Sequence, residues 1–273
     1  MTKSLLRSIG TTERTPMGQR MRFFVSSAAI SHIKSKWTIA ILVISYALIF
    51  VPRLFMTLSM ATPFDASFYA TYFSESDLFI LLLVAVVGSG VIANDMKNGS
   101  LVLLFTTSFG RMRYVTGRIA TVFLLTGLLT LLPPLMLLIV ALLASAPSLS
   151  AFMDGGWVIG GVIGFSLMVT GFYVLVVSAL SSAFADRRYA GAALFFIVLV
   201  SDIVRSILSS ITSSNYVHLV SVFDNITMVA SYFFRSPPPF PVEQGYSALV
   251  LLGAMAASAY VLYTTLIKRE VVT

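Results

Sequence analysis

Long apolar runs recur along this chain, and no other feature of the sequence constrains its fold as strongly. Runs of about 17 or more largely apolar residues return between Trp37 and Ile267, and a helix of that length crosses the hydrocarbon core of a bilayer. Only 11% of the residues are charged, compared with roughly 25% in a soluble domain. The sequence therefore predicts an all-α polytopic membrane protein whose surface mostly faces lipid.

We expect six transmembrane helices in one transmembrane domain, residues 37–273. The helices lie near residues 37–60, 77–93, 119–146, 157–185, 190–209 and 246–267. An N-terminal segment, residues 1–36, precedes the domain. It is too polar to resemble a cleavable secretory signal, so we expect it to be retained.

The basic residues lie almost entirely on one side of the predicted spans. Of the 18 lysines and arginines, 15 fall in the N-terminal segment, the second and fourth loops and the C-terminal tail. The exceptions are Arg53, Arg205 and Arg235. Because cytoplasmic segments are rich in lysine and arginine, we expect a multi-pass protein of the cell membrane with both termini in the cytoplasm. The net charge of +7 is explained by this orientation, so no nucleic-acid partner is predicted.

An amphipathic helix is predicted in the cytoplasmic N-terminal segment. Its basic residues point away from an apolar stripe at helical spacing, which is typical of a helix in the membrane interface. The stripe consists of Met17, Met21, Phe24, Val25, Ala28 and His32. A fraying cytoplasmic arm is the alternative interpretation.

Two features within the spans predict local packing. Pro133 and Pro134 interrupt the backbone hydrogen bonds of the third span, so this helix should kink or unwind in its outer half. Gly156, Gly160 and Gly164 repeat every four residues and give the fourth span a smooth strip for a neighbouring helix.

The outer part of the chain between the fifth and sixth spans is enlarged. Residues 210–245 carry a broken apolar stripe that ends in a proline-rich run, so we expect one or two short helices in the outer interface.

Asp202 and Arg205 stand three residues apart in the fifth span and should pair or face a polar cavity, because a lone charge in hydrocarbon is costly. Neutralising Asp202 should therefore matter more than reversing Glu75, which we place in an outer loop.

Several classes of chemistry are excluded or disfavoured. The chain has no cysteine and no P-loop motif, so it has neither a thiolate site nor that means of using ATP. Gly88, Gly90 and Ala93 match a dinucleotide fingerprint, but they end an apolar helix, so helix packing explains them better. His32 and His218 fall on opposite sides of the membrane and cannot share a metal. We expect no catalytic residue, metal site or cofactor in this chain, which argues against an intramembrane enzyme.

The most informative cytoplasmic stretch is residues 94–118, between the second and third spans. A polar turn from Asp95 to Ser100 precedes a helix-like leucine segment, and Gly117 and Arg118 open the third span. The stretch has one apolar face and several charged side chains, which suits docking of a soluble partner. An ordinary positive-inside loop is the alternative.

At these positions the sequence resembles the permease subunits of type-2 ABC transporters. After their second span, those proteins carry an acidic residue four before a Gly-Thr pair, a leucine-rich segment, a proline-containing turn and a Gly-Lys pair. This chain offers Asp95, Gly99, Ser100, Leu101, Leu103, Leu104, Thr107, Arg111, Gly117 and Arg118. It departs from the family in having Lys97 where a second acid is common, Phe109 and Gly110 instead of the proline turn, and Arg118 for lysine. The layout of an entry helix, six spans and an enlarged outer segment is also similar.

The resemblance implies the transmembrane permease subunit of an ABC exporter, driven by ATP that a separate subunit hydrolyses. It implies three kinds of partner, namely an ATP-binding subunit with its ATP and Mg, a second permease subunit, and membrane lipid. The residues implied to couple to the ATP-binding subunit are Asp95, Gly99, Leu103, Leu104, Arg111 and Arg118. A smaller contact is implied at Asp186, Arg187 and Arg188. A non-transporting scaffold that anchors an ATP-binding partner is the alternative, and no substrate class is predicted.

Overall fold

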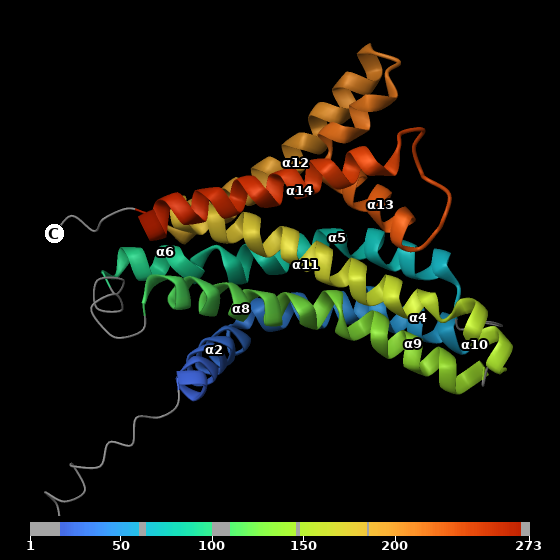
Figure 1. Ribbon diagram of the computed structural model, residues 1–273, viewed down its shortest axis with the longest axis horizontal. Helices are drawn as coiled ribbons and strands as arrows, with labels where there is room; N and C mark the ends of the chain where they lie inside the picture. Colours follow the sequence, from blue (N-terminus) through green and yellow to red (C-terminus); the bar gives the residue numbers. More distant parts are fainter. Residues whose placement is uncertain (1–16, 60–63, 100–109, 146–147, 185, 269–273) are drawn as a thin grey trace, which may run out of the picture.

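The computed structural model describes residues 17–59, 64–99, 110–145, 148–184 and 186–268. Within these ranges the chain is all-α, and six helices are long and apolar enough to cross a membrane (Figure 1). They extend over Lys36–Leu58, Ala66–Lys97, Arg111–Ala144, Leu149–Ala183, Arg187–Ile211 and Gln244–Leu266. The predicted fold class of a polytopic membrane protein with six transmembrane helices is therefore confirmed.

Most spans consist of shorter elements joined end to end. In chain order the spans are α3 (Lys36–Ser45), η1 (Tyr46–Phe50) and α4 (Val51–Leu58); α5 (Ala66–Gly88) and α6 (Gly90–Lys97); α8 (Arg111–Thr130) and α9 (Leu132–Ser145); α10 (Leu149–Gly155) and α11 (Trp157–Ala183); α12 (Arg187–Ile211); and α14 (Gln244–Leu262) with η3 (Tyr263–Lys268). The elements outside the spans are α2 (Met17–Ile33), η2 (Asn215–Val220) and α13 (Val222–Phe233). We call the end of the bundle that carries Lys97 and Arg187 the inner end, and the opposite end the outer end.

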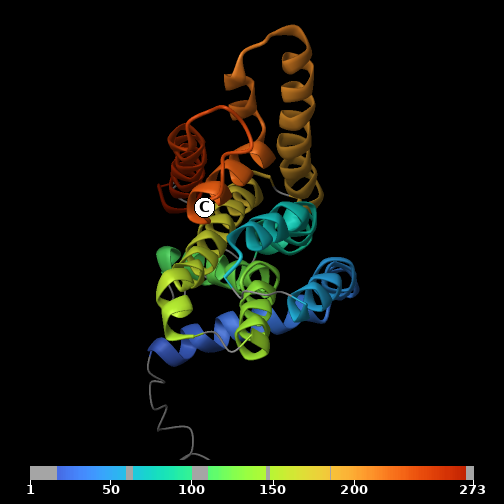
Figure 2. The same cartoon turned by 90° about the vertical axis from the view of Figure 1, so that its right-hand side faces the viewer.

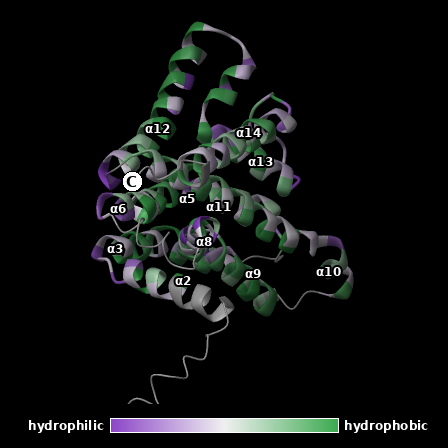
Figure 3. Cartoon of the chain, turned by 60° about the vertical axis from the view of Figure 1, so that its left-hand side comes forward, coloured by the Kyte–Doolittle hydropathy of each residue, from purple (hydrophilic) through white to green (hydrophobic). Residues whose placement is uncertain are grey.

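Helices α5 and α11 form the centre of the bundle. The most apolar windows of their spans are 78% and 61% buried, compared with 17%, 11% and 17% in the first, fifth and sixth spans. The rings of Phe73 on α5 and Phe165 on α11 meet edge to face at 4.7 Å, and Phe234 packs on both. The later half of α12 and the return through η2 project away from this core (Figures 1 and 2). Hydrophilic residues gather at the two ends of the bundle, with hydrophobic helix surface between them (Figure 3).

The second span begins at Ala66, not at residue 77 as the sequence analysis placed it. Asp65 caps the helix by accepting hydrogen bonds from the backbone N–H groups of Ser67 and Phe68. The placement of Glu75 in a loop was wrong, because Glu75 lies within the helix and pairs with Arg53 at 2.9 Å. Glu75, which the sequence analysis took as the end of a loop, is thus neutralised by Arg53 of the neighbouring span.

Several spans contain breaks between elements, and two of these breaks have a clear cause. The predicted break near Pro133 and Pro134 is confirmed, because α8 ends at Thr130 and α9 begins at Leu132. A second break separates α5 from α6 at Ser89. There Ser181 of α11 accepts hydrogen bonds from the N–H groups of Ile92 and Ala93, each at 3.0 Å, and donates to the Ser89 carbonyl. A neighbouring helix thus satisfies backbone groups near the break, as an apolar surrounding requires.

The glycine strip of α11 packs on α13, but it differs from the predicted one. A Cβ on Gly164 would lie 2.7 Å from the Phe233 ring, and one on Gly161 would lie 3.0 Å from the Phe233 carbonyl oxygen. A Cβ on Gly160 would meet nothing within 4 Å. Close packing therefore requires glycine at 161 and 164, whereas Gly160 faces open space.

The elements outside the spans lie at the two ends of the bundle. Helix α2 lies at the inner end and contacts α8 (Figure 1). Its side chains are described from Val25 onward, where Val25, Ala28 and His32 are half-buried while Ser26 and Ser27 are exposed. At the outer end, η2 and α13 are the expected short helices between the fifth and sixth spans. Their depth in a bilayer stays a prediction.

Candidate functional site

The inner ends of α6 and α8 are joined by an ion pair. The carboxylate of Asp95 on α6 pairs with the Arg118 guanidinium and accepts a hydrogen bond from the Tyr114 hydroxyl at 2.5 Å. Both partners belong to α8, and Arg118 also lies over the Tyr114 ring at 5.6 Å. The side chains of Asp95 and Arg118 are each only 15% exposed. The pair therefore joins α6 to α8 at the two ends of residues 96–117. We call this segment the loop 96–117, and it includes the last residues of α6 and the first turns of α8.

Two glycines with positive φ flank residues 100–109. Gly99 has φ 67° and Gly110 has φ 68°, a conformation that residues with a Cβ adopt only under strain. The N–H of Gly99 donates to the Met96 carbonyl at 3.2 Å, so Gly99 ends α6. Arg111 is half-buried and begins α8. Leu103 and Leu104, which complete the predicted coupling set, lie outside the described residues.

A second ion pair connects α6 to the start of α12. The Lys97 ammonium lies 2.8 Å from Asp186, which also caps α12 by accepting the backbone N–H of Arg188. The Arg188 N–H and the Lys97 ammonium together hold the pKa of Asp186 below its ordinary value. Because both side chains are substantially exposed, this pair is expected to contribute little stability.

His32 of α2 lies between positive charges at the same end. Burial lowers the pKa of His32, and the charges of Arg118 on α8 and Arg187 on α12 lower it further. The imidazole is therefore neutral at pH 7, and it packs α2 against the inner end as part of the apolar stripe.

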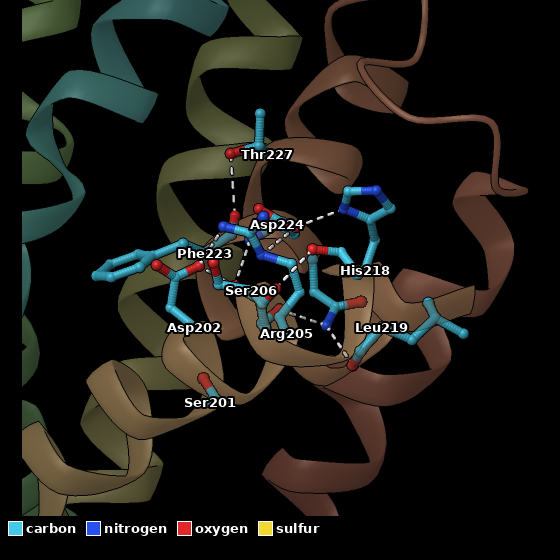
Figure 4. Close-up of polar contacts among 12 residues, drawn as sticks. Ser201, Asp202, Arg205, Ser206, His218, Leu219, Phe223, Asp224 and Thr227 are labelled. Atoms are coloured by element: carbon cyan, nitrogen blue, oxygen red, sulfur yellow. Dashed lines mark hydrogen bonds and ion pairs between the residues drawn. The ribbon is translucent and has the colours of Figure 1, made fainter. Parts of the chain in front are cut away.

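The outer half of α12 carries a polar network with η2 and α13 (Figure 4). Arg205 pairs with Asp202 at 2.9 Å, so the interaction expected from their spacing is observed. Arg205 also lies 3.4 Å from Asp224, which in turn contacts the Nδ1 atom of His218 at 2.7 Å. Ser221 donates a hydrogen bond to Asp202 at 3.2 Å. The network therefore ties α13 to the fifth span, and its role in transport stays a prediction.

Sequence reasoning missed a buried acid, Asp77. Because the second span starts at Ala66, Asp77 lies well inside it and is 4% exposed. Its Oδ1 atom has no hydrogen-bond partner among the described residues, and neither does the buried hydroxyl of Tyr173 on α11. The sequence does contain a signal for this burial. At helical spacing, Asp77 shares one face of the helix with the buried residues Tyr69, Tyr72, Phe73 and Ile80.

Comparison with models of known protein families gives no match, and comparison with curated proteins gives none. The family resemblance therefore rests on the motif between the second and third spans and on the layout. Within the described residues, no group of three or more histidine, aspartate or glutamate side chains is arranged to hold a metal ion. What the geometry offers is mechanical, namely a loop whose ends are clamped to two spans.

Proposed function

We propose that this chain is the transmembrane permease subunit of an ATP-binding cassette exporter, and that a separate subunit hydrolyses the ATP. The observation that carries the proposal is the Asp95–Arg118 pair at the base of the loop 96–117. These two residues are among the charged positions, together with Arg111, at which the sequence resembles type-2 permeases. The pairing gives both motif residues one physical role, since they hold together the ends of the loop that a partner would push.

The same pair suggests how motion would pass into the membrane. Packed helices shift as rigid units instead of deforming smoothly. Because the loop is clamped to α6 and α8, a partner that displaces it would move the second and third spans together. The Lys97–Asp186 pair would extend the displacement to α12. An ATP-binding subunit that closes on nucleotide is a source of such movement, and a second permease subunit would complete the pathway.

The proposed orientation places the inner end in the cytoplasm. It is supported by the 15 of 18 basic residues in the segments predicted to be cytoplasmic. In the described residues α2, the end of α6 and η3 lie at that end of the bundle, as six spans require (Figure 1). Both termini of a cell-membrane protein would then share the compartment in which ATP is available.

The orientation can be tested cleanly because the chain has no cysteine. We expect a thiol introduced by Asp154→Cys to react with an impermeant reagent in intact cells, and one introduced by Lys97→Cys to be protected. The reverse pattern would overturn the orientation and, with it, the inner docking surface.

The functional assignment is tested by purification from native membranes. We expect a protein with a P-loop to copurify with the chain, and its ATP hydrolysis in proteoliposomes to rise with a transported compound. Purification of an intact chain without any ATP-binding protein would contradict the proposal. The alternative is a membrane scaffold that anchors an ATP-binding partner, and it predicts a complex whose hydrolysis responds to no transported compound.

A further inference from the structure

Two adjoining cavities lie at the outer end, between α11, α13 and α14. The first has a volume of about 580 Å³ and polar lining residues that include Ser231, Arg235, Ser236 and Gln244. The second has a volume of about 420 Å³ and an apolar lining that includes Met168, Val229, Ala248 and Leu252. Tyr232, Phe233 and Gln244 line both cavities. A polar compartment and an apolar one therefore lie side by side, and each is within the size range of small-molecule sites.

The backbone at Arg235 is held in an unusual conformation. Helix α13 ends with hydrogen bonds from the Ser236 N–H to the Ser231 carbonyl and from the Arg235 N–H to the Tyr232 carbonyl. This helix-ending motif needs a left-handed residue, which is usually glycine. Arg235 occupies that position with φ 48°, and it is the one non-glycine residue with positive φ in the described part of the chain. Because strained backbone conformations cluster at functional sites, an arginine in this conformation suggests a role for its side chain.

The Arg235 side chain faces the polar cavity as an uncompensated cation. Its guanidinium lies over the Trp157 ring at 4.6 Å, and both residues line the cavity. Arg235 forms no ion pair with any described acidic residue. A guanidinium fixed on an aromatic face presents its N–H groups to planar or tetrahedral acids.

We infer that these cavities bind an anionic amphiphile, with its acidic head on Arg235 and its hydrocarbon chain in the adjoining apolar cavity. The cation provides the contact for the head, and the apolar lining provides the place for the chain. Gly160 leaves the polar cavity open, since a Cβ there would meet nothing within 4 Å. The ligand is a bilayer phospholipid or a single-chain amphiphile of the same chemistry. The inference concerns binding and does not depend on an ATP-binding partner.

Tryptophan fluorescence tests the inference directly. The chain has two tryptophans, so Trp37→Phe leaves only Trp157, which lines the polar cavity. The full chain is reconstituted in phosphatidylcholine bilayers that contain a fixed fraction of lipid with brominated acyl chains. The brominated lipid is phosphatidylglycerol in one sample and phosphatidylcholine in the other. Bromine quenches a tryptophan that it contacts. We expect phosphatidylglycerol to be favoured about fivefold at Trp157, the selectivity that one arginine supplies near a membrane surface.

Three variants in this background decide the role of the site. Arg235→Gly relieves the backbone strain and should bring the selectivity to about one, whereas Arg235→Lys should keep most of it. Gly160→Leu fills the polar cavity and should also remove the selectivity. Gly253→Leu is the matched control, because Gly253 is exposed on α14, lines neither cavity and has open space around its Cβ position.

The outcomes separate the possibilities. Equal quenching by the two lipids in the parent protein, or unchanged selectivity in Arg235→Gly, would overturn the inference. An equal loss of selectivity in Gly253→Leu and Gly160→Leu would also overturn it, because the effect would then be a general disturbance of the helices. Competition by an unbrominated alkyl sulfonate, added to the aqueous phase, distinguishes a single-chain ligand from a bilayer phospholipid. Recovery of fluorescence assigns the site to a single-chain ligand, and persistent quenching assigns it to a bilayer phospholipid.

Discussion

The inner and outer ends of the bundle use ion pairs in different ways. At the inner end, Asp95 and Arg118 are both largely buried and join two spans directly. At the outer end, Arg205 is shared between Asp202 and Asp224, which joins one span to a short helix. The outer network therefore has redundancy, since its cation contacts two acids.

This difference indicates where force can be transmitted. A buried pair between two spans makes them move together, and it is sensitive to the loss of either charge. A shared network positions α13 and tolerates the loss of one acid, because the cation retains another. The inner end is thus suited to drive the spans, and the outer end is suited to hold the wall of the cavities beside Arg235.

The largest effect is expected at the inner pair. Asp95→Ala leaves Arg118 without its carboxylate in a mostly buried position, and removing one partner of a buried pair costs about 3–5 kcal/mol. Chemical unfolding of the purified protein measures this loss. The double variant Asp95→Ala with Arg118→Ala should be less destabilised than the sum of the single variants. Additive effects would show that the pair does not join α6 to α8.

An intermediate effect is expected in the outer network. Arg205→Gln leaves two carboxylates without their cation and should cost about 1.5–3 kcal/mol, whereas Asp202→Asn should cost about 1 kcal/mol because Arg205 keeps Asp224. The same unfolding measurement compares the two. Glu243→Gln is the control, since Glu243 is exposed and has no ion pair among the described residues. Glu75 cannot serve as one, because it pairs with Arg53. The proposed redundancy fails if Asp202→Asn costs as much as Arg205→Gln.

The smallest effect is expected from His32 and depends on pH. The pKa of His32 is lowered in the folded protein, so the unfolded chain binds a proton at higher pH than the folded chain does. The neutral imidazole therefore contributes its full stability above the ordinary pKa of 6.5, and this contribution is lost as the pH falls toward the folded value. Thermal unfolding between about pH 8 and 5 should show a smaller acid-induced loss in His32→Gln than in the parent protein. Identical profiles would contradict the lowered pKa.

Much of the fold follows from the sequence because hydrophobicity and proline act locally. The six spans and the break before Pro133 depend on such local properties. The start of the second span was misjudged because Glu75 and Asp77 resemble a boundary, and only the packing of Arg53 shows how Glu75 is accommodated within the helix. The pairing of Asp95 with Arg118 joins helices across a loop, so the family resemblance suggested their importance but the sequence did not predict their contact. The cavities beside Arg235 depend on three helices and could not be predicted from any one segment.

The account rests on contact between the loop 96–117 and an ATP-binding subunit, and site-specific crosslinking tests it most directly. In the cysteine-free chain, Leu103→Cys places a single thiol for a photoactivatable crosslinker in native membranes. We predict capture of a P-loop protein whose yield changes with added nucleotide, and no such capture from Asp154→Cys at the outer end. Failure to capture that protein from residue 103 while it still copurifies with the chain, or equal capture from residue 154, would contradict the account.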